Sequence, residues 1–412
     1  MKRADGRRYG WVVRTLSAVL SAVLLLGVVS AGLTISGEGW AAAQRETEAY
    51  AYLKERLDGL SDGWAARALR EIASWFAGAS DAKGCYQKAA ARLNRGDEAG
   101  ALAWLQRAID KSEGAQRAEA ALCAACLTSL TGDAKSAAGY AVEAVKLAPE
   151  DRQARWLSYL FLSGAGDTPG AAEALAAYAG LSGERGRYEE AARLATEGGD
   201  HAAAIRYYSM AMHGGASDEL LYLRGLSYQS NGELEAAAAD LALSEYPGCL
   251  YALGTIEWTL GRGEEAARSL EKSIARGERE NDARRLLAVI RLQAGAFKEA
   301  EALLDEYLQA GGQLIDIAYY RGSARALAGD YEGAISDFDA AALTEEFGSD
   351  GLFGGAQCRY LAGRNEEAAE RLLRCIREGV FVAQSRYYLG MTYLRLGETE
   401  RAAEQLKLAL GE

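Results

Sequence analysis

The sequence predicts an all-α protein built as a solenoid of stacked helical hairpins, and three periodic features lead to this prediction. Over the C-terminal part of the chain a glycine recurs every 34 residues, an alanine follows it after five residues, and a large apolar residue comes four positions later. A small residue also stands seven positions before each glycine. The glycines are Gly261, Gly295, Gly329, Gly363 and Gly397, and the last copy continues with Ala402 and Leu406.

Each unit of this length accommodates two helices and little else. Residues 387–396 place apolar side chains at spacings of three and four, which is typical of an amphipathic helix. The glycine then ends the helix, because a residue without Cβ adopts the left-handed conformation at low cost. Acidic residues follow, as in Glu398 and Glu400, and these suit the positive end of a second helix. The unit is therefore a helix, a tight turn and an antiparallel helix.

This pattern resembles the tetratricopeptide repeat family. The resemblance is carried by Leu389, Gly390, Tyr393, Ala402 and Leu406, with Gly322, Ala334 and Phe338 in an earlier copy. It implies a right-handed superhelix of helical hairpins whose concave face binds peptides or protein surfaces. The family's tyrosine, three residues after the first small residue, is replaced in four copies. The replacements are Glu257, Arg291, Arg325 and Arg359.

Weaker copies of the pattern extend the array towards the N-terminus. Their turn glycines are Gly96, Gly132, Gly166, Gly199 and Gly232. We therefore expect about ten hairpins, preceded by a capping hairpin in residues 36–80, where Gly63, Ala68 and Ile72 keep the spacing. The composition agrees with an all-helical array, because half of the residues are hydrophobic and only three are prolines.

One interval is shorter than the others. Gly232 and Gly261 are 29 residues apart, and the shortfall lies around Pro247 and Gly248, which end a helix early. The shortened hairpin is either tolerated within a continuous array, or it is a kink that divides the repeats into two arms. The arms would be residues 81–247 and residues 248–412.

The start of the chain predicts a membrane segment. Residues 1–14 hold five basic residues and one acid, and residues 15–35 form an uncharged apolar run that is just long enough to span a bilayer. The basic flank should remain in the cytoplasm, which would place the repeats on the extracytoplasmic side of a single span. The alternative is a secretory signal that is cleaved, which would release the repeats as a secreted or periplasmic protein.

Charge and motif content exclude several functions. The net charge is −12, and because residues 1–14 carry +4 the rest carries −16, so nucleic acid is not an expected partner. Two histidines and no phosphate-binding glycine loop leave no catalytic, cofactor or metal site to predict.

Cys123 and Cys126 have the spacing of a redox pair. They lie within a predicted helix among alanines, however, and this position favours the interpretation that they are buried small hydrophobic residues. A disulfide between them, or between Cys358 and Cys375, remains open.

Two sets of residues are candidates for binding. A large side chain stands three residues before the first small residue in most copies, and the resemblance implies that this position faces the concave groove. This aromatic stripe comprises Tyr86, Trp156, Tyr222, Tyr251, Tyr319, Phe353 and Tyr387. It suits a peptide-binding surface, or it packs neighbouring hairpins. The arginines Arg291, Arg325 and Arg359 recur beside it, either to hold ligand carboxylates or to pair with acids of adjacent helices.

The sequence thus predicts a membrane-tethered, extracytoplasmic scaffold that binds proteins and has no catalytic activity. The rival predictions are an accessory protein that binds cell-wall glycan and, third, a thiol redox protein that uses Cys123 and Cys126. The chain stops at Glu412 directly after the last second helix. Because stacked arrays expose apolar surface at their ends, we expect Leu406 and Leu410 to dock on a partner or a second copy.

Overall fold

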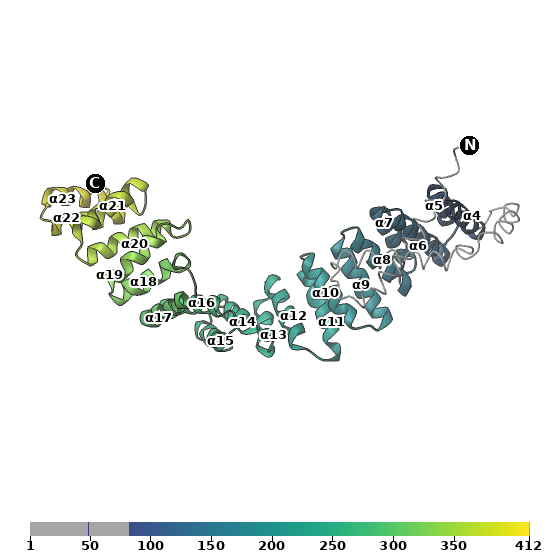
Figure 1. Cartoon of the computed structure of the whole chain (residues 1–412), viewed down its shortest axis with the longest axis horizontal. Coiled ribbons are helices and arrows are strands. Elements are labelled where there is room, and N and C mark those ends of the chain that lie inside the picture. Colours follow the sequence, from purple (N-terminus) through teal and green to yellow (C-terminus); the bar gives the residue numbers. More distant parts are fainter. Residues whose placement is uncertain (1–47, 49–81, 412) are drawn as a thin grey trace, which may run out of the picture. The chain divides into compact units, whose positions relative to one another are not determined.

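The computed structural model describes residue 48 and residues 82–411, and in that part of the chain every regular element is a helix. The helices pair into ten hairpins, in agreement with the expected number (Figure 1). Packing contacts divide the chain into two compact units, Met1–Ala216 and Ser217–Glu412. In each unit a helix packs mainly against its neighbours in sequence, as in a stacked array.

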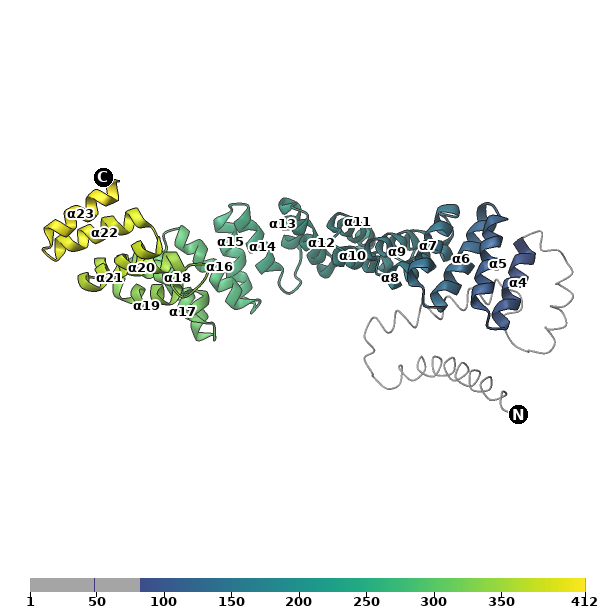
Figure 2. The same cartoon turned by 90° about the horizontal axis from the view of Figure 1, so that it is seen from above.

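The first unit contains four described hairpins, whose helices lie side by side in Figure 2. They are α4 (Ala82–Asn94) with α5 (Glu98–Asp110), α6 (Gly114–Leu130) with α7 (Ala134–Leu147), α8 (Arg152–Gly164) with α9 (Thr168–Ser182), and α10 (Gly186–Glu197) with α11 (His201–Ala211). The short 3-10 helix η1 (Met212–Gly214) follows.

The second unit contains six hairpins. They are α12 (Asp218–Ser230) with α13 (Leu234–Leu243), α14 (Cys249–Thr259) with α15 (Gly263–Ala275), α16 (Glu280–Gln293) with α17 (Phe297–Gln309), α18 (Ala318–Ala328) with α19 (Tyr331–Ala341), α20 (Gly348–Leu361) with α21 (Asn365–Glu378), and α22 (Val382–Arg395) with α23 (Thr399–Leu410). A 3-10 turn, η2 (Leu314–Asp316), precedes α18.

The turn inside each hairpin depends on the recurring glycine. All ten turn glycines, from Gly96 to Gly397, have φ between 74° and 92°, the left-handed region that was predicted for them. In half of the hairpins the next residue is an aspartate that caps the second helix. Asp330, for example, accepts a hydrogen bond from the backbone N–H of Gly333 at 2.9 Å.

Close contact between the two helices of a hairpin explains the small residue seven positions before the turn. A Cβ atom on Gly254 would lie 2.8 Å from Cγ of Leu270, and one on Gly390 would lie 2.7 Å from Cγ of Leu406. In these hairpins the large apolar residue of the second helix therefore sits directly on the small residue of the first helix. Three of the residues that recur in the sequence therefore have a structural role: the glycine forms the turn, and the small residue and the large apolar residue form the contact between the two helices.

Three predictions about organisation remain predictions. The apolar run 15–35 lies outside the described residues, and so, apart from residue 48, does the capping hairpin 36–80. Among the described helices, none combines the length and the apolar character that a bilayer span requires. The boundary between the two compact units lies between Ala216 and Ser217, whereas the boundary between the predicted arms lies at residue 247. On either side of residue 247, α13 and α14 pack together within the second unit.

The helix contact can be tested with a larger side chain. We expect Gly254→Val to destabilise the second unit by about 1–3 kcal/mol, because it forces Leu270 out of its position. Urea unfolding of the full-length chain, followed by circular dichroism, measures the effect. Gly263→Ala is the matched control in the same hairpin, since its Cβ would meet nothing closer than 3.9 Å. Equal stability of the two variants would contradict this account of the small residue.

Candidate functional site

A hollow of about 670 Å³ lies over α20 in the second unit. We call it the α20 groove. Its walls come from α18, the start and middle of α19, α20, and the first turn of α22. Its lining residues include Tyr319, Ser323, Leu327, Phe338, Asp350, Phe353, Gly354, Gln357, Cys358, Leu361, Phe381 and Gln384.

Gly354 allows the ring of Phe338 to form part of the groove wall. Gly354 occupies the position that holds Tyr320 in the preceding hairpin and Tyr388 in the following one. A Cβ on Gly354 would lie only 2.9 Å from Cε1 of Phe338, so the ring of Phe338 approaches the α20 backbone closely and lines the groove. The place of the missing side chain is taken by Phe338, and residues of α18 and α22 complete the lining.

Exposed leucines line the end of the groove at the C-termini of the first helices. Leu327 is 61% exposed and Leu361 is 45% exposed, and the two are 34 residues apart. The neighbouring copies have Gln293 and Arg395 at the same position. Leucines that stay exposed beside a hollow indicate an interaction surface. These residues were not predicted from the sequence, although leucines at positions where the flanking copies hold Gln293 and Arg395 were a visible signal.

The aromatic stripe mainly packs against the loop that follows the second helix of its own hairpin. Tyr319 stacks on Phe347 with ring centroids 4.5 Å apart, and Phe353 lies 5.1 Å from Phe381. Similar contacts join Tyr222 to Tyr246 at 5.0 Å and Tyr251 to the guanidinium of Arg279 at 4.6 Å. Within the stripe, Tyr319 and Phe353 also line the groove, so the structure brings two of its seven members together there.

The three recurring arginines are paired with carboxylates of the chain itself. Arg291 contacts Glu271 at 2.6 Å and Glu299 at 3.3 Å. Arg325 contacts Glu301 at 2.8 Å and Asp337 at 2.9 Å. These contacts match the interpretation in which the arginines join adjacent helices, and none of the three lines the groove.

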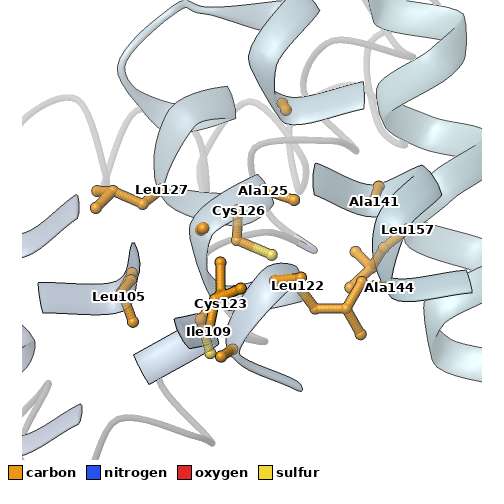
Figure 3. Close-up of a cluster of buried hydrophobic side chains, with 14 of the residues drawn as sticks. Leu105, Ile109, Leu122, Cys123, Ala125, Cys126, Leu127, Ala141, Ala144 and Leu157 are labelled. Atoms are coloured by element: carbon orange, nitrogen blue, oxygen red, sulfur yellow. The ribbon is translucent and has the colours of Figure 1, made fainter. Parts of the chain in front are cut away.

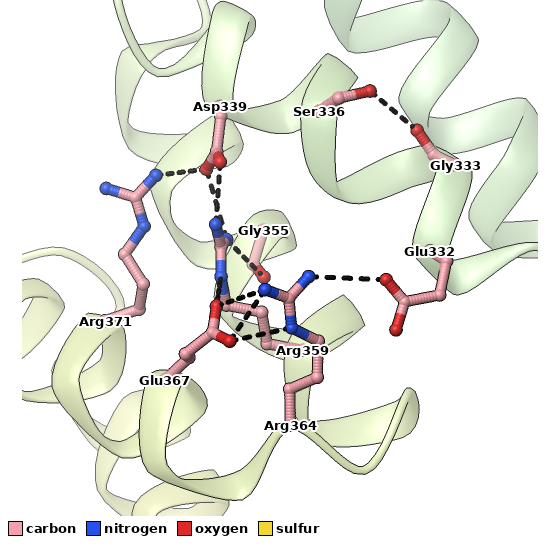
Figure 4. A network of polar contacts seen from close by, with 9 residues as sticks. All are labelled: Glu332, Gly333, Ser336, Asp339, Gly355, Arg359, Arg364, Glu367 and Arg371. Atoms are coloured by element: carbon pink, nitrogen blue, oxygen red, sulfur yellow. Dashed lines mark hydrogen bonds and ion pairs between the residues drawn. The ribbon is translucent and has the colours of Figure 1, made fainter.

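Arg359 belongs to a network that joins α19, α20 and α21 (Figure 4). Its guanidinium contacts Asp339 at 2.7 Å and Glu367 at 3.5 Å, and it donates to the carbonyl of Gly355 at 3.1 Å. Arg371 also contacts Asp339. Burial of Asp339 acts in the opposite direction, but hydrogen bonds from the two arginines outweigh it and hold the pKa of Asp339 below its usual range.

Two stretches of the second unit match a known family. A family model for the tetratricopeptide repeat matches residues 251–314 and 358–412, a region that includes the last four residues of α20 and all of α22. The chain carries tetratricopeptide repeats. A comparison with curated proteins found no match.

Solved structures similar to the chain include several with tetratricopeptide repeats. A repeat protein from Parabacteroides merdae ATCC 43184 is 18% identical, with 55% of this chain and 92% of that chain covered and a TM-score of 0.39. YrrB, described as having an unusual peptide-binding site, is 19% identical over 40% of this chain and 84% of its own, with a TM-score of 0.38. Naa15/Naa10 bound to HypK-THB is 16% identical, covers 80% and 58%, and has a TM-score of 0.45.

The remaining stripe residues lie in other repeats and do not reach the groove. In the first unit, Tyr86 donates a hydrogen bond to the carbonyl of Gln116 at 3.3 Å, and burial raises the pKa of its hydroxyl. Trp156 packs against Tyr178 with ring centroids 5.0 Å apart. Tyr387, on α22, is 49% exposed. Whether these side chains bind a partner stays a prediction.

The last repeat exposes apolar surface, as expected. Leu410 is 80% exposed, whereas Leu406 is half-buried against Gly390. Docking of this end on a partner or a second copy stays a prediction.

The cysteines are buried and free, and their environment argues against thiol chemistry. Cys123 and Cys126 lie in α6 among Leu105, Ile109 and Leu122, as Figure 3 shows. Burial, followed by the neighbouring Cys123, raises the pKa of Cys126 well above its usual value. Reactive thiols need a low pKa and access to solvent; Cys126 has neither, and Cys123 is fully buried. The described residues also contain no cluster of histidine, cysteine and carboxylate side chains that could hold a metal ion.

A buried carboxylate in the repeats should be far more important for stability than an exposed one. Asp337 is fully buried and accepts hydrogen bonds from Arg321 at 2.7 and 3.0 Å and from Arg325 at 2.9 Å. We expect Asp337→Ala to lower the free energy of unfolding by about 3–5 kcal/mol, because two arginines lose their shared partner.

The control for this substitution is Glu332→Ala on the same helix. Glu332 is exposed and contacts Arg364 at 3.3 Å, so its loss should change stability by less than about 1 kcal/mol. Urea unfolding of both variants provides the comparison. If Asp337→Ala lowers the free energy of unfolding no more than Glu332→Ala does, the buried ion pairs of Asp337 do not stabilise the fold.

Proposed function

We propose that the chain is a scaffold that binds a segment of a partner protein in the α20 groove. The observation that carries the proposal is the pair Leu327 and Leu361, which remain exposed along an open hollow with aromatic walls. Stacked helical repeats present extended surfaces of this kind to peptides and proteins. Covering two leucines provides apolar burial, and the rigid rings of Tyr319 and Phe353 supply further contact area without losing much side-chain freedom.

The groove supports this function better than it supports glycan binding. A saccharide usually stacks on an accessible aromatic face and needs several polar groups for its hydroxyls. In the groove, Tyr319 is already stacked on Phe347 and Phe353 packs against Phe381. The most exposed residues that line the groove include leucines. A partner with aliphatic side chains therefore matches the lining more closely.

Site-specific photo-crosslinking tests the proposed function. A photoreactive benzoylphenylalanine in place of Leu361 should give an adduct with a partner protein in cells. The matched control places the same residue at Leu343, which is 82% exposed but does not line the groove. Adding Leu327→Ser should weaken the Leu361 adduct about tenfold or more, since burial of one leucine contributes about 1.5–3 kcal/mol. Equal adducts from both positions, or no adduct from Leu361, would refute binding in the groove.

We further propose that the scaffold is tethered to a membrane by residues 15–35, with the repeats on the extracytoplasmic side. The uncharged run and its basic flank support this arrangement.

Extraction and proteolysis in a bacterial host test the tether. The full-length chain should stay with the membrane through an alkaline carbonate wash, and protease added outside spheroplasts should digest the repeats. A variant that lacks residues 1–36 should be released. A shortened mature chain that washes off the membrane would instead favour the cleaved signal.

A further inference from the structure

One carboxylate of the α20 groove has no partner among the residues that the structure describes. Asp350 lies in the first turn of α20, is half-buried and lines the groove. In the described part of the chain its carboxylate makes no hydrogen bond and no ion pair, whereas nearby Asp337 and Asp339 are each held by two arginines. An unpaired carboxylate next to aromatic side chains is therefore a feature of the groove itself.

Any ligand that fills the groove also covers Asp350. Burial of an unpaired charge is unfavourable unless the ligand supplies an opposite charge. Among the described residues that line the groove there is no lysine or arginine, so a ligand carboxylate would meet only a like charge. The arginines that might have held an anion are paired elsewhere. The electrostatics of the groove therefore favour a cationic ligand.

The positions of the groove residues along α20 limit the ligand further. Asp350 and Leu361 lie at opposite ends of the helix, about 16 Å apart at a rise of 1.5 Å per residue. In the part of the chain that the structure describes, the side-chain amides of Gln357 and Gln384 make no hydrogen bond, and both line the groove. An extended backbone has free N–H and C=O groups that such amides can satisfy, and it covers this distance in about five residues.

We propose that the α20 groove takes an extended segment of a partner protein in which a lysine or arginine precedes or follows an aliphatic side chain by about five residues. The cation pairs with Asp350, and the aliphatic side chain packs between Leu327 and Leu361. This inference rests on the proposed function, because it names the chemistry of the segment that the groove binds.

Selection from a random peptide library displayed on phage tests the charge preference. The full-length protein should enrich peptides that combine lysine or arginine with an aliphatic residue. Asp350→Lys should reverse the preference and enrich peptides with aspartate or glutamate in place of the cation. The matched control is Glu345→Lys, an exposed residue that does not line the groove, and it should select the same peptides as the wild type. An unchanged preference in Asp350→Lys would overturn the inference.

Binding of one enriched peptide, measured by fluorescence anisotropy, separates this inference from the proposed function. Asp350→Asn should weaken binding about tenfold at low salt and less at high salt, because screening weakens the ion pair. The double variant Leu327→Ser, Leu361→Ser should abolish binding. If the double leucine variant loses binding but Asp350→Asn binds the peptide like the wild type, the inference on charge is wrong while the groove remains the binding site. If neither matters, the proposed function fails as well.

Discussion

The contact between a small residue of one helix and a large apolar residue of the next determines most of this structure. Because Gly254 has no side chain, Leu270 can rest on the α14 backbone, and the corresponding contact recurs between Gly390 and Leu406. This contact sets the separation and the rotation of the two helices in a hairpin. The rotation then decides which side chains of a first helix face the groove, the neighbouring hairpin or solvent.

The repeat could be predicted from the sequence because its causes are local. A left-handed turn requires glycine, and a close helix contact requires a small residue facing a large one, so the requirements repeat with each hairpin. Ten hairpins could be counted for this reason. The groove depends instead on residues that vary between copies: Gly354 stands where the adjacent hairpins have Tyr320 and Tyr388, and Leu327 and Leu361 stand where the flanking hairpins have Gln293 and Arg395. A search for the shared pattern passes over such residues.

The candidate binding residues show where periodicity stops being informative. The spacing correctly placed Tyr319 and Phe353 at one helix position, but the residues that pack on them, Phe347 and Phe381, lie in irregular loops 28 positions further on. The arginines have periodic partners on the preceding helices, since Glu271, Asp305 and Asp339 each stand 20 residues before their arginine. The further contacts of Arg325 with Glu301 and Asp337 have no counterpart in the other two copies. Sequence spacing therefore identified the helix face of these side chains, but it could not show how much of that face the chain itself occupies.

The buried thiols have a consequence for how the protein responds to its surroundings. They lie in five helices, from Cys85 in α4 to Cys375 in α21, and all are buried, although Cys358 also lines the α20 groove. In a stacked array such segments can open one at a time, without unfolding of the whole chain. Oxidation of a given cysteine would then record the opening of that stretch of repeats, so the chain carries a chemical record of where along its length it loosens.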